Sequence, residues 1–220
     1  MKKIFLVLLL AVGSIVSAQT AKEIIDKNIE LSGGLTNWKL LNSVLLQGRV
    51  TLGINDEYAI KIYQQRPNLT KTTITIGKKE TTVEGYDGTK GYAMNYATNK
   101  TQEYPNYMAE SFDNDFIDWE NKGFEAKYLG KEKVGDIYCH KVELTKNVNK
   151  TLYFFDSKTY MLLKEIKKDE TLGYSDFRMV GSLMMPYRIE SSSPKKDSDY
   201  VMILNKIEIN KVFPANTFKF

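Results

Sequence analysis

The sequence predicts an α+β fold: a strongly curved antiparallel sheet of about eleven strands, a half-barrel, with helices covering its concave face. Three observations predict it. Apolar and polar residues alternate with a period of two through most of the chain. Turn signals follow one another at hairpin spacing, and only two stretches of substantial length have a helical period. No linker or low-complexity segment interrupts the pattern, so we expect residues 19–220 to form one domain.

The first residues have the pattern of a secretory signal peptide. Lys2 and Lys3 precede an apolar run, and small residues end at Ala18, where cleavage is expected. The apolar run is well short of the ~20 residues that span a bilayer. No cysteine stands directly after Ala18, so the mature N-terminus cannot receive the lipid anchor of a bacterial lipoprotein. Residues 1–18 are therefore predicted to be a signal peptide, and the mature protein to be soluble and periplasmic.

Composition excludes several functions. The chain of 220 residues is 42% apolar and 26% charged, with a formal net charge of +4. No run of basic residues is longer than two, so we expect no nucleic-acid partner. One histidine and one cysteine leave little material for a metal site or a catalytic nucleophile. We expect no enzymatic activity, no cofactor and no metal.

An amphipathic helix is predicted to lead the domain. Thr20 and Glu23 have the spacing of a capping box, and Gly33 with Gly34 is a strong helix stop. The apolar positions between them are Ala21, Ile24, Ile25, Ile29 and Leu31. A further short turn is expected at Trp38 to Leu41.

Strands are predicted in two groups, from Ser43 to Ala97 and from Ala126 to Asn210. In the first strand Val44, Leu46 and Val50 share one face of the period-two pattern. Arg66-Pro67 breaks the pattern, and Asp87-Gly88 is a hairpin signal. Strands that follow one another at this spacing favour an antiparallel meander.

The segment Asn106 to Lys122, between the two groups, is predicted to be a helix. Met108, Phe112, Phe116 and Trp119 recur at helical spacing. One interpretation is a helix that packs this stripe on the sheet as core. The other is a mobile cover over an apolar concavity, and the sequence leaves both open.

Few polar residues have a pattern typical of a catalytic or metal-binding site. Cys139 and His140 are neighbours on a strand, so their side chains point to opposite faces and cannot act as a pair. His140 is expected to be packed among apolar side chains. Glu80 and Glu84 are interpreted as part of a solvated strand edge. The acidic residues of the middle segment lack a calcium-binding loop and are interpreted as a solvent-facing surface: Asp113, Asp115, Asp118 and Glu120.

Several strands carry more apolar residues than one buried face needs. Leu152 to Phe155, Met161 to Leu163 and Leu183 to Met185 are uninterrupted apolar runs. Consecutive apolar residues on a strand indicate that both faces are dry. A closed sandwich would use them as core, whereas an open half-barrel would use one face to line a lipid-sized cavity. Methionine suits such a cavity because its thioether adapts to varied guests.

Three short motifs resemble the periplasmic lipoprotein carriers of the LolA and LolB superfamily. Gln65 to Leu69 is similar to the family's Arg-Pro motif, and Glu84 to Lys90 with Tyr92 resembles its Asp-Gly hairpin. Val212 to Phe218 is similar to its closing segment. Order and spacing agree from about Ile24 to the C-terminus, although the middle segment does not match.

The resemblance implies a monomeric carrier that takes up lipoprotein acyl chains, or another lipid, and delivers them toward the outer membrane. An inner-membrane exporter and an outer-membrane acceptor would be its partners. By position, Arg66 takes the role of the family's latch, which holds the cover shut in the free protein and lets go on loading. Choosing one face of each strand, we expect the apolar cavity to be lined by Val50, Leu52, Ile60, Ile62, Met94, Phe112, Phe116, Phe154 and Leu163.

Two alternatives stay open. The same sheet could serve as a protein–protein interaction or envelope-stress-sensing module without lipid. A hydrolase is the second alternative, but the sequence offers no recognisable nucleophile–base pair.

Overall fold

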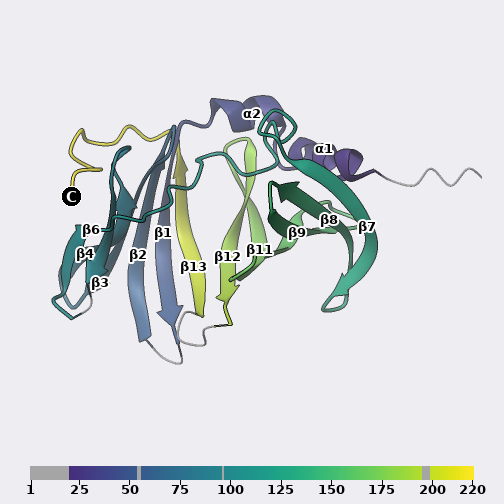
Figure 1. Cartoon of the computed structure of the whole chain (residues 1–220). Coiled ribbons are helices and arrows are strands. Elements are labelled where there is room, and N and C mark those ends of the chain that lie inside the picture. The colour runs from purple at the N-terminus through teal and green to yellow at the C-terminus, as the bar shows by residue number, and fades with distance from the viewer. Residues whose placement is uncertain (1–19, 54–55, 96, 195–198) are drawn as a thin grey trace, which may run out of the picture.

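The computed structural model describes residues 20–53, 56–95, 97–194 and 199–220, so the predicted signal peptide lies outside it. In this part of the chain, thirteen strands form one open antiparallel sheet (Figure 1). The first group is β1 (Ser43–Leu52), β2 (Asp56–Gln65), β3 (Leu69–Ile76), β4 (Lys79–Tyr86), β5 (Gly91–Asn95) and β6 (Lys100–Glu103). The second is β7 (Glu125–Val134), β8 (Ile137–Lys146), β9 (Asn149–Asp156), β10 (Leu162–Ile166), β11 (Thr171–Val180), β12 (Leu183–Ser192) and β13 (Tyr200–Ile209).

The curved antiparallel sheet confirms the predicted fold class, but its strand count differs. Thirteen strands are seen in the described residues, rather than about eleven. The strand β6 was missed because its sequence, Lys-Thr-Gln-Glu, has no apolar alternation. It is held by backbone pairing with β5, as an edge strand can be.

One strand pair joins the two groups. Within each group every strand pairs with its neighbour in sequence, whereas β1 pairs with β13. A bulge interrupts this pairing between Gln47 and Gly48. A Cβ atom at Gly48 would overlap the carbonyl oxygen of Ile203 on β13. Only glycine therefore permits the close approach of these two strands.

Two helices precede the sheet, α1 (Ala21–Leu31) and α2 (Leu35–Leu40). The predicted capping box is present: Glu23 N–H donates to Thr20 Oγ1 at 3.2 Å, and Thr20 N–H donates to Glu23 Oε2 at 2.8 Å. The helix ends at the predicted glycines, with Gly33 at a φ of 131°. Neither helix of the described residues has the length and apolar character needed to cross a membrane.

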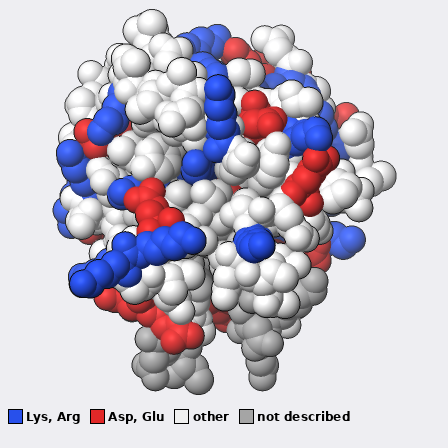
Figure 2. All heavy atoms as spheres, turned by 90° about the vertical axis from the view of Figure 1, so that its left-hand side faces the viewer, with Lys and Arg blue, Asp and Glu red and all other residues white. Residues whose placement is uncertain are grey.

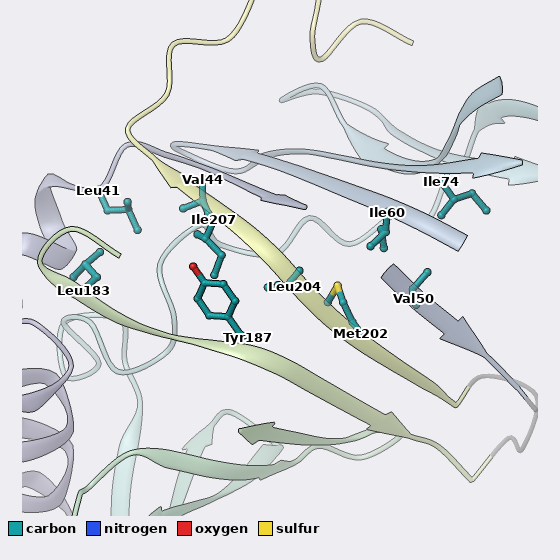
Figure 3. Close-up of a cluster of buried hydrophobic side chains, with 10 residues drawn as sticks. All are labelled: Leu41, Val44, Val50, Ile60, Ile74, Leu183, Tyr187, Met202, Leu204 and Ile207. Atoms are coloured by element: carbon teal, nitrogen blue, oxygen red, sulfur yellow. The ribbon is translucent and has the colours of Figure 1, made fainter. Parts of the chain in front are cut away.

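The concave face of the sheet, which we call the inner face, carries two hydrophobic clusters. The central cluster lies mainly between β1, β2, β12 and β13 (Figure 3) and consists of Leu41, Val44, Val50, Ile60, Ile74, Leu183, Tyr187, Met202, Leu204 and Ile207. The helix cluster packs α1 onto β8 and β9 and consists of Ala21, Ile24, Ile25, Phe116, Val142, Leu144, Tyr153 and Phe155. The helix α1 thus covers one end of the inner face and leaves the rest to other parts of the chain.

The prediction of a helix from Asn106 to Lys122 is wrong. Residues 104–124, which we call the strap, contain turns and irregular backbone. The Asn114 side chain accepts hydrogen bonds from the N–H groups of Phe116 and Ile117, at 3.0 and 3.1 Å. Such a local bond competes with helix formation. Phe112 packs against the central cluster and Phe116 belongs to the helix cluster, so the apolar stripe serves two separate sites.

We predict that Gly48→Ala destabilises the protein by about 1–3 kcal/mol, because the added methyl group pushes β1 and β13 apart. Thermal and urea unfolding would measure the change. Gly173→Ala on β11 is the matched control, since a Cβ atom there meets its neighbours only at 3.8 Å or more. Equal stability of the two variants would contradict a special role for the β1–β13 contact.

Candidate ligand-binding site

The strap crosses the inner face of the sheet from β6 toward the two helices (Figure 1). At its start, the Tyr107 ring stacks on Tyr86 with a centroid distance of 5.8 Å. It lies across Gly91, where a Cβ atom would overlap it. Further along, Phe116 is 3% exposed and packs edge-on against Tyr153. Side-chain anchors rather than regular backbone hydrogen bonds therefore position the strap.

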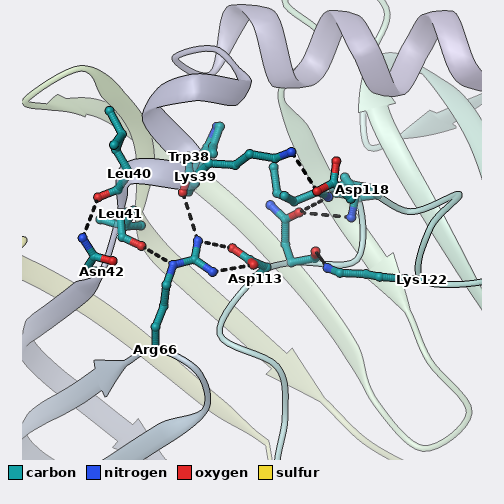
Figure 4. A network of polar contacts seen from close by, with 12 residues as sticks. Trp38, Lys39, Leu40, Leu41, Asn42, Arg66, Asp113, Asp118 and Lys122 are labelled. Carbon is teal, nitrogen blue, oxygen red and sulfur yellow. Dashed lines mark hydrogen bonds and ion pairs between the residues drawn. The ribbon is translucent and has the colours of Figure 1, made fainter.

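Arg66 holds the middle of the strap (Figure 4). Its Nη1 and Nη2 donate to the two carboxylate oxygens of Asp113 at 2.6 and 2.5 Å. Its Nε donates to the carbonyl of Leu41 at 2.6 Å, and Nη2 also to that of Trp38 at 3.2 Å. The guanidinium carbon lies 4.9 Å from the centre of the Phe112 ring. Arg66 thus ties the strap to the C-terminal end of α2 and to Leu41, the residue that follows it.

Three cavities lie between the strap and the sheet. The sheet cavity, lined by Ile62 and Met202 among others, has a volume of about 640 Å³. The helix-side cavity, which includes Tyr153 and Glu165, has about 420 Å³, and the latch cavity, which includes Asp113 and Leu204, has about 230 Å³. The two larger ones fall in the range of ligand pockets, ~300–1,000 Å³. They share the lining residues Glu110, Ser111, Lys167 and Tyr174 and so meet beneath the strap.

The sheet cavity has a broad apolar wall. Its apolar lining residues come from β1, β2, β11, β12, β13 and adjoining segments: Leu46, Ile62, Leu69, Met108, Phe112, Leu172, Ile189 and Met202. The latch cavity, below Phe112 and Asp113, extends this wall with Val44, Met185 and Leu204. Hydrocarbon could therefore lie along the sheet under the strap.

The floor of the helix-side cavity is charged. Glu165 is 7% exposed, accepts a hydrogen bond from the Tyr174 hydroxyl at 2.9 Å and pairs with Lys167 at 3.2 Å. Burial raises the pKa of Glu165 and outweighs the opposing effects of Lys167 and Tyr174. Burial acts to lower the pKa of Lys167, but Glu165 and Glu110 raise it overall. Asp115 of the strap accepts a hydrogen bond from the Tyr153 hydroxyl at 2.7 Å.

A second group of carboxylates lines the sheet cavity. Glu84 accepts a hydrogen bond from Thr72 Oγ1 at 3.3 Å, and Glu170 accepts one from Ser191 Oγ at 2.7 Å. Desolvation raises the pKa of Glu84, and the charges of Glu110 and Glu170 raise it further. Burial, then Glu170, Glu84 and Glu110, raise the pKa of Tyr200 to about 12. These three carboxylates therefore act on one region of the cavity.

Some of the predicted lining residues reach the cavities. Ile62 and Phe112 line the sheet cavity, and Phe116 lines the helix-side cavity. Others belong to the tightly packed interior: Val50, Ile60 and Met94 are 4%, 8% and 6% exposed and line none of the three cavities. Leu52 is 36% exposed, at the end of β1.

For β9 and β10 the structure places the neighbouring residues inside. Tyr153 and Leu162 line the helix-side cavity, whereas Phe154 lies on the outer face between Lys141 and Lys164. Leu163 lines a different hollow. A bulge between Leu162 and Lys164 shifts the alternation and brings Glu165 to the inner face. Because both faces of these strands are apolar, the sequence carried no signal for the choice.

The interpretation of the acidic residues needs correction. Glu84 is solvent-exposed as predicted, but it lies on β4, which is an inner strand and not an edge of the sheet, and it lines the sheet cavity. In the strap, Asp113 and Asp115 bind Arg66 and Tyr153, and Asp118 pairs with Lys39 at 2.8 Å. Among the described residues, no group of histidine, cysteine or carboxylate side chains could hold a metal ion.

His140 and Cys139 lie on opposite faces of β8, as predicted. His140 is 1% exposed, stacks on Tyr160 and accepts or donates a bond at 3.2 Å with the Tyr128 hydroxyl. Burial lowers the pKa of His140, which favours its neutral form. It is a packed side chain beside α1, away from the three cavities.

No protein-family model matches the sequence, and no curated protein matches it significantly. Solved structures do. A LolA superfamily protein from Nitrosomonas europaea has a TM-score of 0.57 at 14% identity, covering 92% of this chain and 99% of its own. A domain assigned as an outer membrane lipoprotein-sorting protein, from Vibrio parahaemolyticus, has a TM-score of 0.57 at 10% identity, covering 90% and 96%. The chain has a LolA-like fold.

A DUF1329 family protein from Desulfovibrio piger shares this LolA-like fold, with a TM-score of 0.58 at 11% identity over 92% of this chain and 98% of its own. The similarity extends over nearly the full length of each protein. It confirms the resemblance seen in the three sequence motifs at the level of the fold.

We predict that Asp113→Asn loosens the strap. The two hydrogen bonds from Arg66 to a carboxylate become one hydrogen bond to the neutral amide oxygen of asparagine. Hydrogen exchange of backbone amides at 107–113 should become about tenfold faster, as expected for the loss of a partly buried charged hydrogen bond. Asp118→Asn is the control, since its pair with Lys39 is about half exposed. That variant should leave the hydrogen-exchange rates of the same amides nearly unchanged. Equal effects would contradict the assignment of Arg66 as the principal anchor.

Proposed function

We propose that this protein is a periplasmic carrier that binds the acyl chains of lipoproteins, or another amphiphile, beneath the strap. The observation that carries the proposal is the row of cavities between strap and sheet, with a continuous apolar wall. Each methylene kept out of water there contributes about 0.8 kcal/mol, so the cavity can hold a long chain that would otherwise be exposed to water between two membranes. The LolA-like fold of the lipoprotein-sorting domain from Vibrio parahaemolyticus supports the same reading.

Loading and release need a cover that moves. The strap lacks regular hydrogen bonding, and between Tyr107 and Phe112 the Met108 side chain is 88% exposed. Arg66 anchors the next part of the strap through one carboxylate and two carbonyl groups. In the proposed cycle Arg66 holds the empty form closed, and cargo displaces the strap. Delivery toward an outer-membrane acceptor, after handover from an inner-membrane exporter, completes the proposal.

We predict that the purified protein binds the neutral fluorescent probe N-phenyl-1-naphthylamine and that Ile62→Trp weakens this binding about tenfold by filling the sheet cavity. Fluorescence titration would measure it. Tyr63→Trp is the matched control, because Tyr63 is the next residue on β2 and packs against Phe213 instead. Mass spectrometry of an organic extract would identify lipid retained during purification.

Absence of both probe binding and extractable lipid would overturn the carrier proposal and favour a protein-interaction module on the same fold.

We predict that Arg66→Leu slows release of a bound acyl probe about tenfold, because the closed form loses a charged hydrogen-bonded contact and competes less well with cargo. Stopped-flow transfer of the probe to lipid vesicles would measure the rate. Arg49→Leu is the control, since Arg49 forms an exposed pair with Glu57 at 3.5 Å. Unchanged release from Arg66→Leu would remove this residue from the mechanism.

A further inference from the structure

The two larger cavities are strongly acidic as well as apolar. Their charged lining residues are the five carboxylates Glu84, Glu110, Asp115, Glu165 and Glu170 and the single ammonium of Lys167, a formal charge of −4. The whole chain, by contrast, has a net charge of +4. On the face at the β6 end of the sheet, basic and acidic side chains are interspersed (Figure 2). The excess of negative charge therefore belongs to the cavities and not to the protein at large.

The carboxylates differ widely in exposure. Glu110 on the strap has a side chain that is 88% exposed, whereas Glu165 in the helix-side cavity is 7% exposed. Glu84, which is exposed, and Glu170, which is half-buried, line the sheet cavity. The walls beside them are apolar, including Leu172, Ile189 and Met202. Hydrocarbon and a positive charge could thus be held side by side.

Most of these carboxylates lack a cation of their own. Among the described residues, Lys167 pairs with Glu165 at 3.2 Å and lies 3.9 Å from Glu110. No ion pair in the same part of the chain involves Glu84, Asp115 or Glu170, whose partners are the hydroxyl groups of Thr72, Tyr153 and Ser191. Carboxylates that line one cavity repel one another, and a bound cation would offset that repulsion.

The chain itself shows how an ammonium is accommodated. Lys167 lies where the two cavities meet, beside Glu165, whose other oxygen accepts the Tyr174 hydroxyl. The carboxylates are spread over both cavities and do not converge as metal ligands among the described residues. An anionic head group would be repelled by the carboxylates in both cavities. The arrangement fits an organic cation attached to an apolar chain.

We propose, on the basis of the carrier function above, that the cargo is an amphiphile bearing an amine. Its hydrocarbon lies on the apolar wall of the sheet cavity, and its ammonium group binds between Glu84 and Glu170. Glu110, exposed on the strap, attracts the charge, and the apolar walls focus the field of the carboxylates.

The test uses three compounds that share a chain of the same length and carry a positive, a neutral or a negative head group: dodecylamine, 1-dodecanol and dodecanoate. Each competes with N-phenyl-1-naphthylamine at pH 7, below its aggregation limit. Dodecylamine should displace the probe at a concentration at least about tenfold lower than 1-dodecanol, and dodecanoate should be the weakest. High salt should reduce the advantage of the amine.

Variants assign the preference to the cavity. Glu84→Gln and Glu170→Gln should each weaken the binding of dodecylamine about threefold to tenfold more than the binding of 1-dodecanol. Glu80→Gln is the matched control on the same strand, because Glu80 pairs with Lys61 and lines none of the three cavities. Thermal unfolding of each variant verifies that it is folded.

The outcomes separate the two proposals. If 1-dodecanol or dodecanoate displaces the probe as well as dodecylamine does, the amine preference is overturned and the carrier function stands. If the amine advantage persists in both cavity variants, the assignment of Glu84 and Glu170 is overturned. If the protein binds neither the probe nor any of the three compounds, the carrier function fails and the inference fails with it.

Discussion

The contact between Arg66 and Asp113 is the interaction on which the site depends. It joins the end of β2, the segment between α2 and β1, and the strap, which are far apart in the sequence. Because guanidinium stays charged and binds a carboxylate with two parallel bonds, one side chain fixes both position and orientation. The strap has no regular backbone structure of its own. Without this anchor, the strap would be held mainly by the aromatic contacts on either side of it.

The hollow interior follows from a mismatch between sheet and helices. Thirteen strands in the described residues present a wide inner face, and α1 covers only the end formed by β7 to β9. Protein interiors normally pack without large voids, since an empty apolar volume forfeits contacts on every side. Here the remaining face is bridged by a strap that touches it at a few aromatic anchors. The space between the anchors forms the three cavities.

The polar groups inside this space are satisfied, which distinguishes it from a packing defect. Within the described residues, no buried side-chain nitrogen or oxygen lacks a hydrogen-bond partner. Tyr153 and Tyr174 donate to Asp115 and Glu165, and Lys167 balances part of the charge. The same groups also give the two larger cavities a net negative charge. In the proposed carrier, the apolar wall sets how strongly a chain is held, and the carboxylates set which head group is accepted.

The sequence alone determined the antiparallel meander, the leading helix and the location of the Arg-Pro break. These depend on local signals: the period of two, the capping box at Thr20, and turn residues such as Asp87 and Gly88. The tertiary structure decided the strap, because Phe112 and Phe116 satisfy a helical period yet pack in different clusters. It also decided which face of β9 and β10 turns inward. Both faces are apolar there, and a bulge after Leu162, set by pairing with β9, brings Glu165 inside.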